Sequence, residues 1–132
     1  MSEFVILFHQ TPESAERADH WDLMIQSGDS LMTWALESSP LAGRVMTAVR
    51  LADHRLEYLD YQGPLSDDRG VVSRLARGTS RRLDKGGDVQ VFQLATADFN
   101  WRVTVTEGKS GQVSIGIESW PGDQSSEPGR PV

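Results

Sequence analysis

The stretch that decides the fold is HWDLMIQSGDSLMTWALE, residues 20–37. It contains two runs rich in apolar and aromatic residues, 20–26 and 31–37, separated by SGDS. Glycine and aspartate between two such runs are typical of a tight turn, so we predict a β-hairpin.

Side chains alternate along a strand, and this alternation divides the first run into two faces. One face carries His20, Asp22, Met24 and Gln26, and the other carries Trp21, Leu23 and Ile25. We expect the apolar second face to be the core face. His20 and Asp22 then lie side by side on the other face, where we expect polar surroundings.

Further short strands are predicted on both sides of this hairpin. The run EFVILFH (3–9) is apolar along most of its length, which favours burial on both faces. The other predicted strands are 43–51, 56–63, 70–78, 89–95, 99–108 and 111–120. About eight short strands at this spacing predict a mainly β protein, either a compact β-barrel or a strongly curved antiparallel sheet.

Helices are expected to be few, one or two in number, and short. TPESAERA (11–18) offers Thr11 as an N-cap and Pro12 at the first helical position, which predicts one or two helical turns. We expect residues 1–120 to form a single domain. Residues 121–132 (PGDQSSEPGRPV) have no apolar periodicity and predict a disordered tail.

Composition excludes several classes of site and of partner. The 132 residues include no cysteine, which excludes disulfides, thiolate zinc sites and cysteine nucleophiles. The apolar run 4–8 is too short for a signal peptide or a membrane span, so we expect a cytoplasmic protein without membrane contact. A net charge of −6 disfavours general coating of nucleic acid. The arginines within 69–85 form either a local phosphate-binding patch or a solvated face.

Two of the three histidines lie close together in the sequence and near an aspartate. His9 ends the strand 3–9, and it comes alongside His20 and Asp22 if the intervening segment returns the chain antiparallel. Two imidazoles and one carboxylate are a suitable ligand set for manganese or zinc. The alternative is that Asp22 only orients His20 and that His9 caps its strand.

The third histidine, His54, directly follows Asp53 and the predicted strand 43–51, where we expect a loop at a sheet edge. Tyr58 follows four residues later. A histidine that can donate a proton or bind phosphate, next to a phenol, suits phosphoryl transfer. The alternative is a turn residue whose ring stacks on Tyr58 or Tyr61.

These segments, in order, resemble the 3′-phosphoesterase domain of bacterial DNA ligase D. That family has a strand that ends in histidine, a His-aromatic-Asp strand, a partner strand that ends in Ser/Thr-Trp-Ala, and an Asp-His-x-Leu-Glu-Tyr segment. The matching stretches are FVILFH (4–9), HWDL (20–23), LMTWAL (31–36), DHRLEYLDYQG (53–63) and DRGVVSRLARGT (68–79). The resemblance covers roughly residues 4–105 in order, and the ordered set is more specific than any single motif.

The resemblance implies a β-barrel-like domain with a manganese-type site. His9, His20 and Asp22 match the metal ligands, and His54 and Tyr58 match the residues on the scissile phosphate. Family members remove 3′-phosphates and 3′-terminal ribonucleotides and leave a 3′-hydroxyl. The implied partners are nucleic-acid 3′ ends and separate ligase or polymerase proteins, and we expect a monomer.

The chain departs from the family where phosphate is held. The family has an arginine two residues after the aspartate, and this chain has Met24. A second family arginine aligns with Met46, or with Arg44 if the alignment slips. Methionine cannot replace the bidentate guanidinium, so Arg69 and Arg74, and less favourably Arg44, are the candidate phosphate-binding residues. This loss also leaves open a non-catalytic, metal-binding accessory module that binds a DNA end or a partner protein.

Overall fold

The structure, a computed structural model, describes residues 2–121, except for the side chain of Lys85. Most of the predicted tail, residues 122–132, lies outside the described residues. The strands are β1 (Ser2–Gln10), β2 (His20–Ser27), β3 (Ser30–Leu36), β4 (Val45–Arg55), β5 (Gly63–Pro64), β6 (Val71–Gly86), β7 (Val89–Ala95), β8 (Asn100–Glu107) and β9 (Gln112–Ser119). The 3₁₀ helices are η1 (Leu56–Leu59), η2 (Ser66–Asp68) and η3 (Lys109–Gly111).

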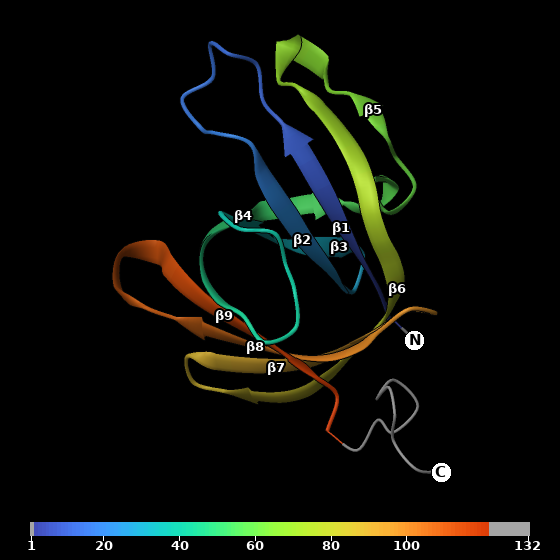
Figure 1. The fold of residues 1–132 in the computed structure, drawn as a ribbon, viewed down its shortest axis with the longest axis vertical. Helices are drawn as coiled ribbons and strands as arrows, with labels where there is room; N and C mark the ends of the chain where they lie inside the picture. Colours follow the sequence, from blue (N-terminus) through green and yellow to red (C-terminus); the bar gives the residue numbers. More distant parts are fainter. Residues whose placement is uncertain (1, 122–132) are drawn as a thin grey trace.

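The strands form one antiparallel sheet that closes into a ring (Figure 1). Its order is β1-β2-β3-β4-β9-β8-β7-β6-β5, and an additional pairing of β1 with β6 closes it. Closure pairs both edges of β1, and the two-residue β5 lies beside the start of β6. The predicted mainly β fold with a strongly curved antiparallel sheet is therefore confirmed.

The long strand β6 makes this closure possible. Its first part pairs with β1, and its second part, from Thr79, pairs with β7. The strand predicted over 70–78 is therefore only the first half of β6. Gly78 lies where the two pairings meet, and a Cβ there would come within 2.0 Å of the Ala95 carbonyl oxygen.

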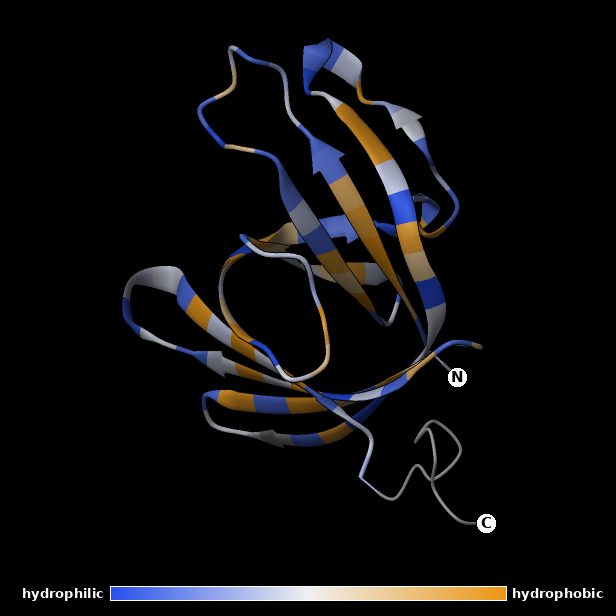
Figure 2. Cartoon of the chain, in the orientation of Figure 1, coloured by the Kyte–Doolittle hydropathy of each residue, from blue (hydrophilic) through white to orange (hydrophobic). Residues whose placement is uncertain are grey.

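Two buried clusters lie on opposite faces of the β2–β3 hairpin. Figure 2 shows the alternating hydropathy of β7 and β9 and the apolar middle of β1, which is buried on both faces as predicted. The larger cluster includes Leu23, Ile25, Trp34 and Phe92. The smaller one comprises Val5, Leu7, Met24, Leu31, Leu59 and Val72. The face of β2 that carries His20 and Asp22, expected to be polar, is therefore buried as well. Residues 56–65, which include η1, cover it.

Two predicted local structures are wrong. No α-helix forms in the described residues 2–121, and residues 11–19 instead make a loop with one tight turn, in which Ala15 N–H donates to the Pro12 carbonyl. The Asp19 carboxylate closes this loop by accepting from Thr11 N–H and Oγ1 at 2.8 and 3.1 Å. Thr11 therefore donates to Asp19 instead of capping a helix. Within residues 2–121, no helix is long and apolar enough to cross a membrane.

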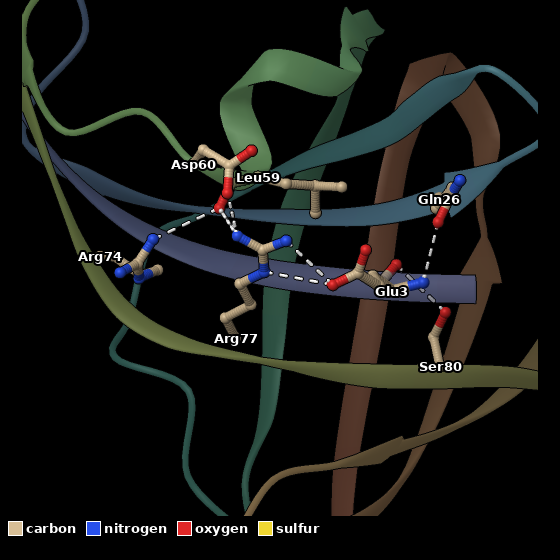
Figure 3. Close-up of polar contacts among 7 residues, drawn as sticks. All are labelled: Glu3, Gln26, Leu59, Asp60, Arg74, Arg77 and Ser80. Atoms are coloured by element: carbon tan, nitrogen blue, oxygen red, sulfur yellow. Dashed lines mark hydrogen bonds and ion pairs between the residues drawn. The ribbon is translucent and has the colours of Figure 1, made fainter. Parts of the chain in front are cut away.

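The predicted strand 56–63 begins as the 3₁₀ helix η1. Arg77 of β6 holds the end of η1, since its guanidinium donates to the Leu59 carbonyl at 2.9 Å and pairs with Asp60 (Figure 3). Glu3 of β1 binds the same guanidinium at 3.0 Å. These contacts fix η1 over the face that carries the smaller cluster, so the chain turns inward instead of continuing as a strand.

Candidate metal centre

Strand pairing brings the two clustered histidines together. His9 of β1 is directly opposite His20 of β2, and Asp22 is opposite Leu7. Because side chains of i and i+2 residues share a face, His20 and Asp22 project to the same side as His9. The predicted grouping of His9, His20 and Asp22 is present in the structure.

The three side chains form a tight cluster. One potential ligand atom from each residue lies within 4.8 Å of the others. His9 Nδ1 is 3.4 Å from Asp22 Oδ2, and His20 Nε2 is 3.1 Å from Asp22 Oδ1. The two imidazole centroids are 4.6 Å apart. His20 and Asp22 are buried, whereas His9 is partly accessible, so the cluster opens to solvent on the His9 side.

Backbone carbonyls hold the remaining nitrogen of each imidazole. His20 Nδ1 donates to the Ala18 carbonyl at 3.0 Å, and His9 Nε2 donates to the Arg69 carbonyl at 2.9 Å. In the neutral histidines these bonds leave the lone pairs on His20 Nε2 and His9 Nδ1, the two atoms that face Asp22. Such outer hydrogen bonds fix the tautomer and orientation of metal-binding histidines.

The aspartate provides a second sign of a cation site. With both histidines neutral, Asp22 Oδ1 is buried and has no hydrogen-bond donor among the described residues 2–121, since the His20 Nε2 atom 3.1 Å away presents a lone pair. A buried carboxylate oxygen without a partner is costly, and two imidazole lone pairs beside it add to that cost. A divalent cation would satisfy all three groups at once. The donor set and its surroundings therefore fit a metal ion.

The pKa values reflect the same arrangement. Hydrogen bonding with Asp22 raises the pKa of His9 above 6.5, against the opposing effect of burial. For Asp22, burial acts to raise the pKa, but interaction with the His20 and His9 imidazoles outweighs it and lowers the pKa below 3.8. The carboxylate is thus ionised at neutral pH, as metal binding requires.

Metal binding is expected to weaken on acidification. The weakening should begin at a higher pH than it would for a histidine of ordinary pKa. The metal needs the lone pair on His9 Nδ1, and a proton on that atom competes with it. Because the pKa of His9 lies above 6.5, the competition begins above that pH and grows as pH falls. Titrating the manganese Kd from about pH 8 to about pH 5 checks this. A Kd that stays constant through this range would contradict the assignment of His9.

A cavity of about 570 Å³ lies in front of the two histidines. The loop between β1 and β2 forms one wall, and Asp68 and Arg69 form the other. Arg17 of that loop lines the cavity and acts to lower the pKa of His9, so its charge reaches the cluster. Sequence reasoning missed Arg17. Its position between His9 and His20 was the available signal, because a loop that joins two paired histidines must lie next to both.

The three arginines proposed for phosphate binding have different positions. Arg69 lines the cavity, and its guanidinium donates to Ser66 at 2.8 and 2.9 Å. The Arg74 guanidinium donates instead to the Leu59 carbonyl at 3.4 Å (Figure 3). Arg44 donates to the Ser39 carbonyl at 2.9 Å, and neither it nor Arg74 lines the cavity.

Met24 lies in the smaller buried cluster, on the same face as Asp22. An apolar patch therefore borders the cluster of ligands, as the alternation of β2 predicts. Met24 is only 1% exposed, so an arginine in its place would bury a charge among apolar side chains, which is costly. The family's arginine is incompatible with the packing observed here.

His54 and Tyr58 form a pair of their own. Their rings meet edge to face with centroids 5.3 Å apart, and His54 Nδ1 donates to the Ala52 carbonyl at 2.9 Å. His54 lies within β4, opposite Leu31, and not in the expected edge loop, because β4 continues to Arg55. Tyr58 lines a second cavity that shares Arg69 with the first, and neither His54 nor Tyr58 lines the first.

The arrangement as a whole can bind a divalent cation beside a solvent-accessible cavity whose lining includes Arg17 and Arg69 as well as Glu16 and Asp68. A cation and guanidinium groups together can bind an anion and polarise it. No protein-family model matches the chain, and no curated protein matches it.

Proposed function

We propose that this protein is a metal-dependent phosphoesterase that acts on nucleic-acid 3′ ends and removes a 3′-phosphate or a 3′-terminal ribonucleotide. The observation that carries the proposal is the cluster of His9, His20 and Asp22 beside a cavity lined by Arg17 and Arg69. The resemblance to the 3′-phosphoesterase domain of DNA ligase D supports the same reaction. Manganese is the preferred metal, with zinc as the alternative.

His9, His20 and Asp22 would hold the metal, which when bound supplies a Lewis acid that polarises a phosphoryl oxygen. Arg69 and Arg17 neutralise the remaining charge of the phosphate. The resemblance assigns His54 to the scissile phosphate. His54 does not line the cavity in front of His9 and His20, so the substrate would have to extend beyond that cavity to reach it. His54 Nδ1 is engaged with a backbone carbonyl, so Nε2 is the atom that would donate a proton to a phosphate oxygen. The Tyr58 hydroxyl is proposed as a second donor to that phosphate.

Separate ligase or polymerase proteins would use the 3′-hydroxyl that the reaction leaves. We place the protein in the cytoplasm, since a chain without cysteine fits a reducing compartment. It would act there as a monomer.

A non-catalytic, metal-stabilised module that binds a DNA end or a partner protein is the second candidate. The burial of Met24 favours it, because the position of the family's arginine cannot contribute to phosphate binding. So do the Arg44 and Arg74 side chains, which bind carbonyls away from the cavity. Turnover decides between the two candidates.

Primer-templates that end in a 3′-phosphate or a 3′-ribonucleotide should be processed in the presence of manganese and not in the presence of a chelator. His54→Ala should reduce the rate by about 100-fold or more, since a positioned proton donor contributes about that much. Gel separation of the labelled ends measures both activities.

Arg44→Ala is the matched control, because Arg44 donates to its own loop and lies outside the cavity. It should leave the rate unchanged. Absence of turnover by the wild-type protein with either substrate would eliminate the enzymatic proposal and leave the binding module.

A further inference from the structure

A second cavity, of about 150 Å³, adjoins the one in front of the histidines and shares Arg69 with it. The segment from Arg55 to Ser66 supplies the rest of its lining. Tyr58, Tyr61, Pro64 and Leu65 supply its aromatic and aliphatic surface. Its charged lining residues are Arg55, Glu57 and Arg69, and Arg55 pairs with Glu57 at 3.4 Å, so Arg69 is the cation free of a carboxylate partner within the lining. Aromatic and aliphatic surface with cationic groups beside it is the chemistry of a site for a planar ring attached to an anion.

The Tyr61 ring is held in one orientation. Its hydroxyl donates to the Pro64 carbonyl, and its ring meets Tyr58 edge to face with centroids 6.2 Å apart. Gly63 allows this arrangement, since it has a φ of +132° and a Cβ there would lie 3.4 Å from the Tyr61 hydroxyl oxygen. Tyr61 is 38% exposed, so part of its surface remains open to a ligand. A fixed, accessible aromatic ring costs little entropy when it binds.

The volume of the cavity limits how large a part of a ligand it can enclose. Leu65 packs against the smaller buried cluster, which gives the cavity a firm apolar side. A volume of about 150 Å³ is comparable to cavities that hold one benzene molecule. One six-membered ring therefore fills this open cavity, and a fused bicyclic ring would extend beyond it.

We propose that this cavity binds the base of the substrate's terminal nucleotide and prefers a pyrimidine to a purine. The inference rests on the proposed function, because it assumes a phosphate in front of His9 and His20. Arg69 lines both cavities, so its guanidinium could contact the base and the phosphate together. The base is recognised by its flat face and its size.

Calorimetric titration of the manganese-loaded protein tests this with uridine 3′-monophosphate, adenosine 3′-monophosphate and inorganic phosphate. The uridine nucleotide should bind about tenfold more tightly than phosphate, the effect expected of one stacked base. It should also bind more tightly than the adenosine nucleotide. Equal affinity for the two nucleotides would overturn the preference for a single ring.

Tyr61→Ala and Tyr61→Leu address the site itself. Both should reduce the affinity ratio of uridine nucleotide to phosphate to about one, and Tyr61→Leu keeps apolar volume in case the alanine variant does not fold. Tyr61→Phe keeps the ring and should retain most of the ratio. A ratio that stays at the wild-type value in Tyr61→Leu would overturn the base site.

These outcomes separate the inference from the proposed function. Nucleotide binding that depends on Tyr61, without hydrolysis of any 3′ end, would keep the base site and eliminate the phosphoesterase. Hydrolysis of 3′ ends at rates that do not depend on the terminal base or on Tyr61 would keep the phosphoesterase and eliminate the base site.

Discussion

Gly78→Ala is expected to lower the free energy of unfolding by about 3 kcal/mol, the upper end of the cost of overpacking. A Cβ at this position would lie 2.0 Å from the Ala95 carbonyl oxygen and 3.0 Å from a ring carbon of Phe4. The carbonyl belongs to the backbone of β7 and the phenyl ring is fully buried, so neither can move aside cheaply. Chemical denaturation followed by circular dichroism measures the loss.

Gly116→Ala is the matched control. Gly116 also lies within a paired strand, β9, but a Cβ there would meet only a side-chain methyl of Val45 at 3.8 Å. Alanine has less conformational freedom than glycine in the unfolded chain, so Gly116→Ala should be neutral or slightly stabilising. Equal stability of the two variants would show that the backbone at Gly78 does not approach the Ala95 carbonyl this closely.

The hairpin β2–β3 could be predicted from the sequence, whereas the closure of the sheet near Gly78 could not. The alternation in β2 and β3 and the turn between them predicted a hairpin, because both signals are local. The closure of the sheet depends on β6 leaving β1 and joining β7, and nothing within residues 71–85 indicates where that change occurs except Gly78. Long-range pairing of this kind is not encoded in any short window.

In the candidate metal centre, too, the local features could be predicted from the sequence and the long-range ones could not. His20 and Asp22 could be placed on one face from their spacing, and His9 joined them because β1 and β2 pair at that point. The burial of that face could not be predicted, since it depends on η1 and on the Arg77 contacts with Leu59 and Glu3, far away in the sequence. The same burial explains why Met24 fits here and an arginine does not.

The loop 11–19 shows a competition that sequence patterns do not resolve. Thr11 and Pro12 are typical of a helix start, but the two ends of the loop are fixed by the pairing of His9 with His20. Asp19 then accepts both hydrogen bonds of Thr11, and the segment closes as a loop. Tertiary constraints on the two ends outweighed the local helix signal. The same closure places Arg17 on the wall of the cavity.

Asp22→Asn is expected to abolish the stabilisation that manganese or zinc gives to the wild-type protein. A ligand that binds only the folded state, at 100 times its Kd, stabilises it by about 2.7 kcal/mol. The amide removes the negative charge, and its N–H can donate to the lone pair on His20 Nε2, which is 3.1 Å from Asp22 Oδ1 in the wild type. The variant would thus lose one metal ligand, and its amide would occupy the lone pair of a second, His20.

The affinity should fall by at least about 100-fold, more than the loss of an outer hydrogen bond causes. Without metal and at a pH above the pKa of His9, Asp22→Asn should be as stable as the wild type or more so, because the buried oxygen that faces neutral imidazoles is replaced by a hydrogen-bonded amide. Thermal unfolding with and without metal gives both quantities. This combination distinguishes loss of a ligand from damage to the fold, since damage would lower the stability of the metal-free protein as well.

Asp53→Asn is the matched control for this experiment. Asp53 carries an exposed carboxylate on β4 that accepts hydrogen bonds from Arg50 and Ser30 at 3.0 and 3.1 Å, and it does not line the cavity in front of the histidines. It should retain the full metal increment. If Asp22→Asn retained it too, the cation would be held elsewhere, and the cluster of two histidines and one aspartate would be a hydrogen-bonded element of the barrel with no role in metal binding.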